Sequence, residues 1–396
     1  MSVPPAQSQS RPTRRPQFRP LIVGAVVAGV ALLAACSSGG TSADPPANSA
    51  QTTGSAATTA CMQAADAYLK PYQQLETTLP ASYTPLQTKP SAGGSIVHLI
   101  GPLPDEIPLS QAQQAAAQAI GWKFTALSFN GTVEDLDAKF EEAVAMKPTM
   151  ITLSGFPLAT IANPVAAAKR AGIVVVLADV ADEPTGYPGF AAVVEGGVVY
   201  NKVGELNAYE FMHDSNCRGN VAIFSLPYPI LTVGTNAFIS TVQQHCPACK
   251  VSTSELQVSD VGTSAATSAI ITKLQSDPAT TYVYGVIGNV VTGLTAALRQ
   301  SGLSGITVFG ADPDDNAIAA IRNGTNKWWV QYGAQLNGWS MIDAGLRAMQ
   351  TRKPVPDNAD YPLGLLTKES TPAGTSLPVV PASYQQAFEA LWHVSG

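Results

Sequence analysis

Short apolar runs alternate with helical stretches through the middle of the chain. Apolar runs that predict strands lie at 96–100, 122–129, 150–153 and 173–177. Helical spacing predicts helices between them at 110–120, 133–146 and 161–171. The first run is apolar apart from His98, which is typical of a strand covered on both faces. Strands that alternate with helices predict a parallel sheet with right-handed crossovers.

The same alternation begins again after residue 201. Helices are predicted at 202–213, 233–245, 265–275, 292–301 and 316–322, with a further helix at 337–349. Strands are predicted at 220–225, 251–256, 281–286, 306–309 and 328–332. The fold class is therefore predicted as α/β, with two doubly wound parallel-sheet lobes in succession. Because ligands bind beyond the carboxyl ends of parallel strands, a cleft between the lobes is the predicted small-molecule site.

The N-terminus has the pattern of an export signal. Residues 1–20 hold four arginines and no acid, and an apolar run of 15 residues follows from Leu21 to Ala35. This order indicates a secretory signal over 1–35. The run ends in Leu33-Ala34-Ala35-Cys36, which resembles the lipobox of bacterial lipoproteins, so Cys36 is the predicted lipidation site. A plain signal peptide is the alternative, and the export route stays open.

Composition separates a tether from the globular part. Residues 36–60 are almost all small or polar, which predicts a flexible tether. A helix and coil extension is expected over 61–93. The chain is 45% apolar and 13% charged, so it is not disordered as a whole. Its net charge of −6 falls to −10 without 1–35, which argues against a nucleic-acid-binding role. No apolar run of membrane-spanning length occurs beyond the N-terminus.

Four short motifs together resemble a known family. They are Ile173-Val-Val-Val-Leu-Ala-Asp179, Tyr200-Asn201-Lys-Val-Gly204, Phe309-Gly-Ala-Asp312 and Gly333-Ala-Gln335-Leu336. Their order and spacing resemble type I periplasmic binding proteins, and most of all the ribose-type group, over roughly 94–370. The resemblance implies two lobes that close on a ligand like a hinged trap, with three crossings near Tyr200, Gln335 and Pro362. It implies an N-terminal lobe of 94–200 and 336–365, a C-terminal lobe of 201–335 and 366–380, and a tail of 381–396.

The resemblance also implies which residues bind the ligand. It assigns two acids at strand ends, Asp179 and Asp312, and two amides near the crossings, Asn201 and Gln335. Carboxylates and amides can bind vicinal hydroxyls in bidentate fashion.

The sequence departs from the ribose-type pattern at several of these positions. Val180 stands where that group has an arginine, and the loop at 226–232 has no base. A less hydroxylated or larger ligand is therefore an alternative, with contact area from aromatic residues. The candidates are Phe156, Tyr228, Trp328 and Trp329.

Four cysteines remain after Cys36. An even number in an exported protein suggests disulfides, and Cys61, Cys217, Cys246 and Cys249 leave three complete pairings open. A local Cys246–Cys249 bond and a bond from Cys217 to either of these are all sterically compatible with the pattern. A thioredoxin-like redox pair and a zinc site are less favoured alternatives, because the four histidines show no metal-ligand spacing with the cysteines.

These observations predict a function. The resemblance implies an extracytoplasmic solute-binding lipoprotein that captures a sugar or sugar-like ligand and delivers it to the permease and ATPase of an ABC importer. We expect a monomer on the outer face of the cytoplasmic membrane, held by its lipid, with no cofactor, metal or nucleic acid. One alternative is a ligand-sensing lipoprotein that docks on a receptor kinase. An exported α/β enzyme is the other, but the chain lacks GxGxxG, GxxxxGK[ST] and GxSxG motifs at strand ends.

Overall fold

The computed structural model describes residues 49–371 and 376–394. The predicted signal over 1–35, Cys36 and the first half of the predicted tether lie outside the described residues. Within the part of the chain that the structure describes, no helix is both long and apolar enough to cross a membrane.

The first lobe is built on a five-stranded parallel sheet in the order β2-β1-β3-β4-β5. Its strands are β1 (Ser95–Ile100), β2 (Lys123–Ser128), β3 (Met150–Ser154), β4 (Val174–Ala178) and β5 (Gly189–Val194). Helices α3 (Val133–Ala145) and α4 (Ala162–Arg170) cover one face, and α2 (Glu106–Ala119) and α10 (Ala334–Thr351) cover the other. Alternate strand residues supply two separate cores, since Ile96 packs in one cluster and Val97 in the other.

The second lobe is built on a six-stranded sheet in the order β11-β10-β9-β8-β6-β7. Its strands are β6 (Asn220–Ser225), β7 (Lys250–Glu255), β8 (Tyr282–Gly285), β9 (Thr307–Ala311), β10 (Asn326–Gln331) and β11 (Gly364–Thr367). Its helices are α5 (Gly197–Asp214), α6 (Pro229–His245), α7 (Ser264–Ser276), α8 (Leu294–Gln300) and α9 (Asp315–Arg322). Only β11 runs antiparallel to its neighbour among these strands. The predicted class of two parallel-sheet α/β lobes is confirmed.

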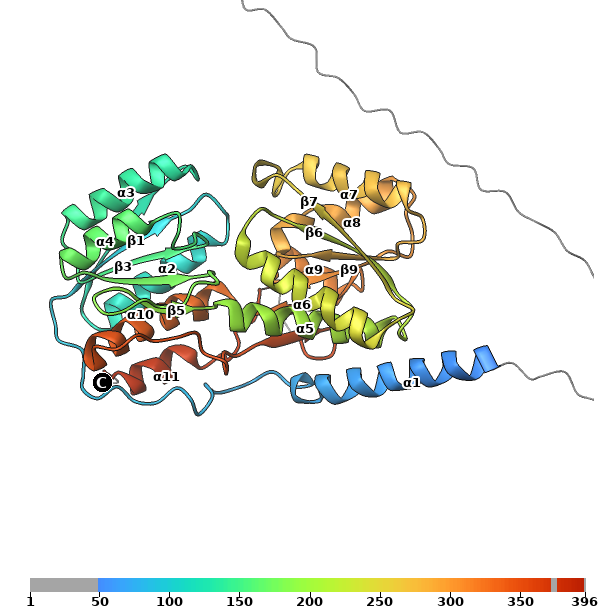
Figure 1. The fold of residues 1–396 in the computed structure, drawn as a ribbon, viewed down its shortest axis with the longest axis horizontal. Helices are drawn as coiled ribbons and strands as arrows, with labels where there is room; N and C mark the ends of the chain where they lie inside the picture. Colours follow the sequence, from blue (N-terminus) through green and yellow to red (C-terminus); the bar gives the residue numbers. More distant parts are fainter. Residues whose placement is uncertain (1–48, 372–375, 395–396) are drawn as a thin grey trace, which may run out of the picture. The chain divides into compact units, whose positions relative to one another are not determined.

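The chain passes between the two sheets three times, and the two lobes stand side by side in Figure 1. Helix α5 leads from β5 to β6, and α10 leads from β10 back onto β4 and β5. The segment after α10 then returns to the second sheet as β11. The first two passages leave from the carboxyl ends of β5 and β10, and the third enters β11, which begins beside the carboxyl end of β10 because the two strands are antiparallel. The crossings therefore lie beside the carboxyl ends of the strands.

Helix α1 (Ser49–Leu69) corrects the predicted tether. The helix begins at Ser49, so the second half of the tether over 36–60 is not coil. Cys61, Ala65 and Leu69 recur every fourth residue and are buried, and α1 packs on α5. An alanine-rich stretch has high helix propensity, and this apolar stripe supplies the packing that stabilises it.

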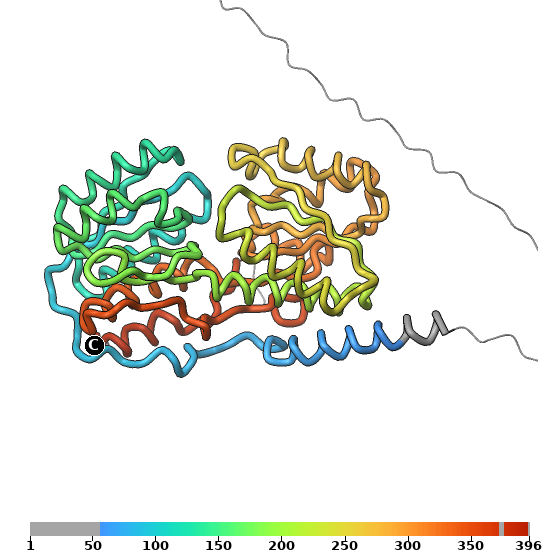
Figure 2. The backbone as a smooth tube through the Cα atoms, in the orientation of Figure 1, coloured from blue at the N-terminus to red at the C-terminus, as the bar shows by residue number. Residues whose placement is uncertain are grey.

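The segment predicted as a C-terminal tail, 381–396, contains a packed helix. Residues 384–391 form α11 (Tyr384–Leu391), and Phe388 and Trp392 are fully buried. The Trp392 ring stacks on Trp339 of α10 with centroids 5.2 Å apart, and its Nε1 donates to Asp343 at 2.8 Å. The segment between α1 and β1 runs along α11 (Figure 2). The Leu86 amide in this segment donates to the Leu391 carbonyl of α11.

The four described cysteines form two disulfides. Cys246 bonds to Cys249, which is the local pairing among those left open. Cys217 bonds to Cys61, not to Cys246 or Cys249. The physical reason is that α1 packs on α5, which brings Cys61 beside Cys217, three residues after the end of α5.

Candidate functional site

One pocket lies where the strand ends of both sheets meet. Its lining comes from the segments that follow β1, β3, β4 and β5 in the first lobe and β6, β8, β9 and β10 in the second. The space between the lining atoms is about 720 Å³ with the open mouth included. This is the cleft position that the sheet topology predicts.

Asp179 is held at the centre of the first-lobe wall. It follows β4 directly in a left-handed conformation, with φ at 56°. Ser154 Oγ donates to its Oδ2 at 2.7 Å, and the Tyr200 hydroxyl donates to its Oδ1 at 3.0 Å. Nδ2 of Asn337 lies 3.4 Å from the same Oδ2. Three donors from three elements therefore fix this carboxylate before any ligand arrives.

Glu195 and Asn337 form a second buried pair beside Asp179. Glu195 follows β5 directly, and each of the two residues is only 2% exposed. Nδ2 of Asn337 donates to Oε2 of Glu195 at 2.8 Å. Among the described residues, Oε1 of Glu195 and Oδ1 of Asn337 accept no hydrogen bond. The sequence reading missed both residues, although Glu195 ends an apolar run as Asp179 does.

Two further acids enter the pocket at the start of α2. Glu106 is 7% exposed, and its Oε2 lies 3.7 Å from Nε2 of His98. Burial lowers the pKa of His98 to about 4, so that ring is neutral near pH 7 and supplies no opposing charge. Oδ1 of the neighbouring Asp105 has no partner among the described residues.

The pocket raises the pKa of its carboxyl groups. Burial is the main cause in every case, and it raises the pKa of Asp179 to about 6 and that of Glu106 to about 8. Burial, and then the charge of neighbouring acids, also raises the pKa values of Glu195 and Asp312. Among the described residues that line the pocket there is no Lys, Arg or His. No cationic side chain at this site therefore offsets the mutual repulsion of the carboxylates, and protonation of some of these acids relieves part of it.

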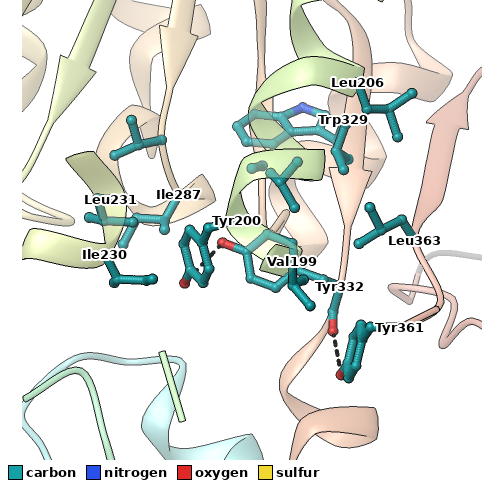
Figure 3. Close-up of a cluster of buried hydrophobic side chains, with 14 of the residues drawn as sticks. Val199, Tyr200, Leu206, Ile230, Leu231, Ile287, Trp329, Tyr332, Tyr361 and Leu363 are labelled. Carbon is teal, nitrogen blue, oxygen red and sulfur yellow. Dashed lines mark hydrogen bonds between the residues drawn. The ribbon is translucent and has the colours of Figure 1, made fainter. Parts of the chain in front are cut away.

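The second-lobe wall is mainly apolar. Ile230, Leu231 and Ile287 line it and gather on one side of the Tyr200 ring (Figure 3). Tyr200 and Tyr332 have ring centroids 5.4 Å apart, and the Tyr332 hydroxyl donates to that of Tyr200 at 3.4 Å. The Tyr361 hydroxyl in turn donates to the Tyr332 carbonyl at 3.1 Å (Figure 3).

Aromatic rings from both lobes close one side of the pocket. Phe156 follows β3 and Tyr228 precedes α6, and their rings meet edge to face with centroids 6.4 Å apart. Asp312 follows β9 with φ at 46°, so it is the second-lobe counterpart of Asp179. The structure thus brings four predicted residues to one pocket: Asp179, Asp312, Phe156 and Tyr228.

The two predicted amides do not line this pocket. Asn201 is exposed on α5 and donates to Oε1 of Glu205 at 2.8 Å, whereas Tyr200 enters the pocket. Successive helical residues point about 100° apart, so both side chains cannot face the cleft. Gln335 lies outside the lining for the same reason, while Ala334 and Asn337 of α10 belong to it. Trp328 and Trp329 are buried in the core of the second lobe and do not reach the pocket.

Comparisons with known proteins agree with this architecture. Residues 107–353 match the model of a periplasmic binding protein domain. A search of curated proteins gives no match.

Several solved structures match most of the chain. An ABC sugar transporter subunit from Rhodobacter sphaeroides is 19% identical with a TM-score of 0.60, covering 70% of this chain and 98% of its own. A glucose-galactose binding protein from Geobacillus stearothermophilus has the same identity and TM-score, covering 71% and 100%. An ABC transporter solute-binding protein from Actinobacillus succinogenes with bound D-allose is 19% identical, with a TM-score of 0.60 and coverages of 70% and 98%. At this identity the likeness shows the fold.

Proposed function

Because this chain belongs to the periplasmic binding protein family, we propose that it is an extracytoplasmic solute-binding lipoprotein that serves an ABC importer. Family membership makes the chain a binding protein and not an enzyme, as the sequence predicted. In the proposal, one small polar ligand is captured between the lobes and released to the permease, whose ATPase drives import.

The observation that carries the proposal is the pocket with an acid from each lobe. Asp179 and Asp312 follow equivalent strands in different sheets and line the same space. A ligand that contacts both is bound better when the lobes are closed, so it shifts an open–closed equilibrium toward the closed form.

A sugar-like ligand is supported by the chemistry of the lining. Carboxylates, an amide and hydroxyls can pair with the donors and acceptors of a polyol, and aromatic rings can cover its apolar face. The matched structures from Geobacillus and Actinobacillus are described as binding glucose and galactose, and D-allose. The polar groups that line this pocket are those of this chain, so the ligands of the matched structures do not identify its ligand. Experiment has to identify it.

The lipid anchor is a separate part of the proposal. It rests on the Leu33-Ala34-Ala35-Cys36 pattern, which precedes the described residues. We expect a Cys36→Ser variant to lose acylation and to leave the membrane fraction. A variant that fractionates with the membrane as the unaltered chain does would contradict the anchor.

Ligand capture is tested by scattering together with mass spectrometry. Native mass spectrometry of the purified protein identifies any retained solute, and solution scattering then compares the chain with and without that solute at saturation. We expect a smaller radius of gyration with ligand bound. An unchanged radius at saturation would contradict closure of the lobes.

A further inference from the structure

The pocket gathers five carboxyl groups around one space. They belong to Asp105, Glu106, Asp179, Glu195 and Asp312, which come from both lobes. Among the described residues, the lining offers no cationic side chain in return. A buried cluster of this kind is costly without a positive partner, because the acids repel one another in a medium of low dielectric.

The pocket atoms that lack a partner are oxygens of two carboxyl groups and one amide, and all three accept hydrogen bonds when the carboxyl groups are ionised. In the described part of the chain they are Oδ1 of Asp105, Oε1 of Glu195 and Oδ1 of Asn337. Glu195 and Asn337 are each 98% buried, with 2% of their surface exposed, and both line the cavity. A group that only donates, such as an ammonium, satisfies such a set, whereas a hydroxyl also brings lone pairs.

Aromatic rings accompany these acceptors. Tyr200, Tyr228, Tyr332 and Phe156 line the pocket beside the carboxylates. The face of an aromatic ring attracts a cation within about 6 Å, most strongly where water is excluded. The opposite wall of Ile230, Leu231 and Ile287 suits an organic group and not a hydrated ion.

From this arrangement we propose that the ligand is a small organic molecule with a positively charged nitrogen, such as an amino sugar or an amine of similar size. The inference rests on the proposed function and narrows its ligand class. The charged nitrogen lies against Asp179, Glu195 and Asn337, and the apolar part of the ligand faces the second lobe.

A metal ion is a poorer occupant of this pocket. An ion requires several oxygen ligands that converge on one point. Among the described residues, the one group of three or more His, Cys, Asp or Glu ligand atoms within 4.8 Å of one another is formed by Cys61, Cys217 and Cys246. Those cysteines are in disulfides, and the pocket carboxylates are spread around the cavity wall. Spread acceptors fit an extended organic cation.

The test compares cations with neutral molecules of the same shape. Calorimetric titration of the dialysed protein uses glucosamine against glucose, galactosamine against galactose, putrescine against butanediol, and choline against its neutral carbon analogue. At about pH 6.5 the primary amines are protonated, and choline carries a permanent positive charge. We expect the cationic member of at least one pair to bind about tenfold to a hundredfold more tightly than its neutral partner.

Two variants separate charge recognition from a folding defect. Asp179→Asn removes a pocket charge, and Glu141→Gln removes an exposed charge on α3 far from the lining. We expect the preference for the cation to shrink in Asp179→Asn and to persist in Glu141→Gln, with circular dichroism unchanged in both.

The outcomes distinguish this inference from the proposed function. If probes bind but the neutral member of every pair binds as tightly as its cation, the cationic ligand class is overturned and solute capture stands. If no cationic probe binds, the inference is contradicted, and if no neutral probe binds either, solute capture is contradicted with it. A preference for the cation that Asp179→Asn leaves intact also contradicts the assigned contact.

Discussion

The two walls of the pocket differ in chemistry although they are built from the same strand–helix unit. The first-lobe wall presents four carboxyl groups and an amide, and its central acid is held by Ser154, Tyr200 and Asn337. The second-lobe wall presents three aliphatic side chains, the rings of Tyr228 and Tyr332, and one acid, Asp312. The same strand–helix unit can therefore place charged groups in the pocket from one lobe and apolar groups from the other.

This difference suggests a division of labour during ligand capture. A preorganised set of acceptors recognises charge, because its side chains do not need to be ordered on binding. An apolar wall gains free energy only when the closing lobe removes water from it. We therefore expect the first-lobe wall to determine which ligand binds and the second-lobe wall to stabilise the closed form.

The largest expected effect is the loss of charge at Asp179. In Asp179→Asn, the asparagine tolerates the left-handed backbone with φ at 56°, so the change removes charge with little strain. We expect affinity for the bound amine to fall about thirtyfold to a hundredfold, measured by calorimetry. Glu141→Gln is the matched control. A loss of less than about threefold in Asp179→Asn would contradict the proposed role of the first-lobe wall.

The same change in the second lobe should have a smaller effect. Asp312→Asn also keeps a left-handed residue, with φ at 46°. Because Asp312 is the one acid on an apolar wall, we expect a loss of about tenfold or less. If Asp312→Asn weakens binding more than Asp179→Asn does, the asymmetry between the walls is wrong.

Replacing Tyr228 separates recognition of a cation by its ring from simple contact area. Tyr228→Leu removes the ring that the second lobe places edge to face against Phe156. A cation–π contact contributes about 0.5–1 kcal/mol, so we expect a loss of about twofold to fivefold for the amine. The neutral partner should lose less under the same titration. An equal loss for both ligands would mean that the ring contributes contact area alone.

A separate expected effect concerns the stability of the ligand-free protein and depends on pH. Burial raises the pKa of Asp179 from its ordinary 3.8 to about 6, so the folded chain holds a proton that the unfolded chain releases between these values. The contribution of Asp179 to the free energy of unfolding is fully present below about pH 4 and is lost as pH rises through 6. It amounts to at most about 3 kcal/mol.

Removing the acid should therefore stabilise the ligand-free protein above pH 6. We expect Asp179→Asn to raise the melting temperature by a few degrees at about pH 7.5 and to change it little near pH 4. Thermal unfolding at both pH values measures this. A variant that melts lower than the unaltered chain at the higher pH would show that the charge of Asp179 stabilises the fold.

Some of the site could be predicted because its residues end strongly apolar strands. Asp179 and Asp312 directly follow such runs, and the period of the pattern placed them correctly at the sheet edge. Glu195 was missed because its strand, Gly189–Val194, contains glycine and alanine and gives a weak strand signal. Asn337 was missed because it lies in the first turn of α10, where only the three-dimensional course of the crossing decides which side chain enters the cleft.

Other differences come from packing that no local pattern encodes. Helix α1 begins before the predicted helix at Cys61 because α5 and α6 offer it a surface. Helix α11 forms where a tail was expected, because Phe388 and Trp392 pack beside Trp339 of a distant helix. Contacts between segments about 50 residues or more apart in sequence determine both elements.

Recognition of a positive charge by the pocket acids should release protons when the ligand binds. The titratable groups that line the pocket or lie against them are Asp105, Glu106, Asp179, Glu195, Asp312, Tyr200, Tyr228, Tyr332, His98, Asp314 and Tyr361. A bound cation favours the ionised form of carboxyl groups whose pKa values are raised, so they release protons. Calorimetric titration of the tightest-binding amine at about pH 7, in two buffers of different ionisation enthalpy, measures the number of protons released per ligand bound. The account predicts release of a substantial fraction of a proton for the amine and almost none for its neutral partner. Equal proton exchange for both ligands, or proton uptake with the amine, would contradict it.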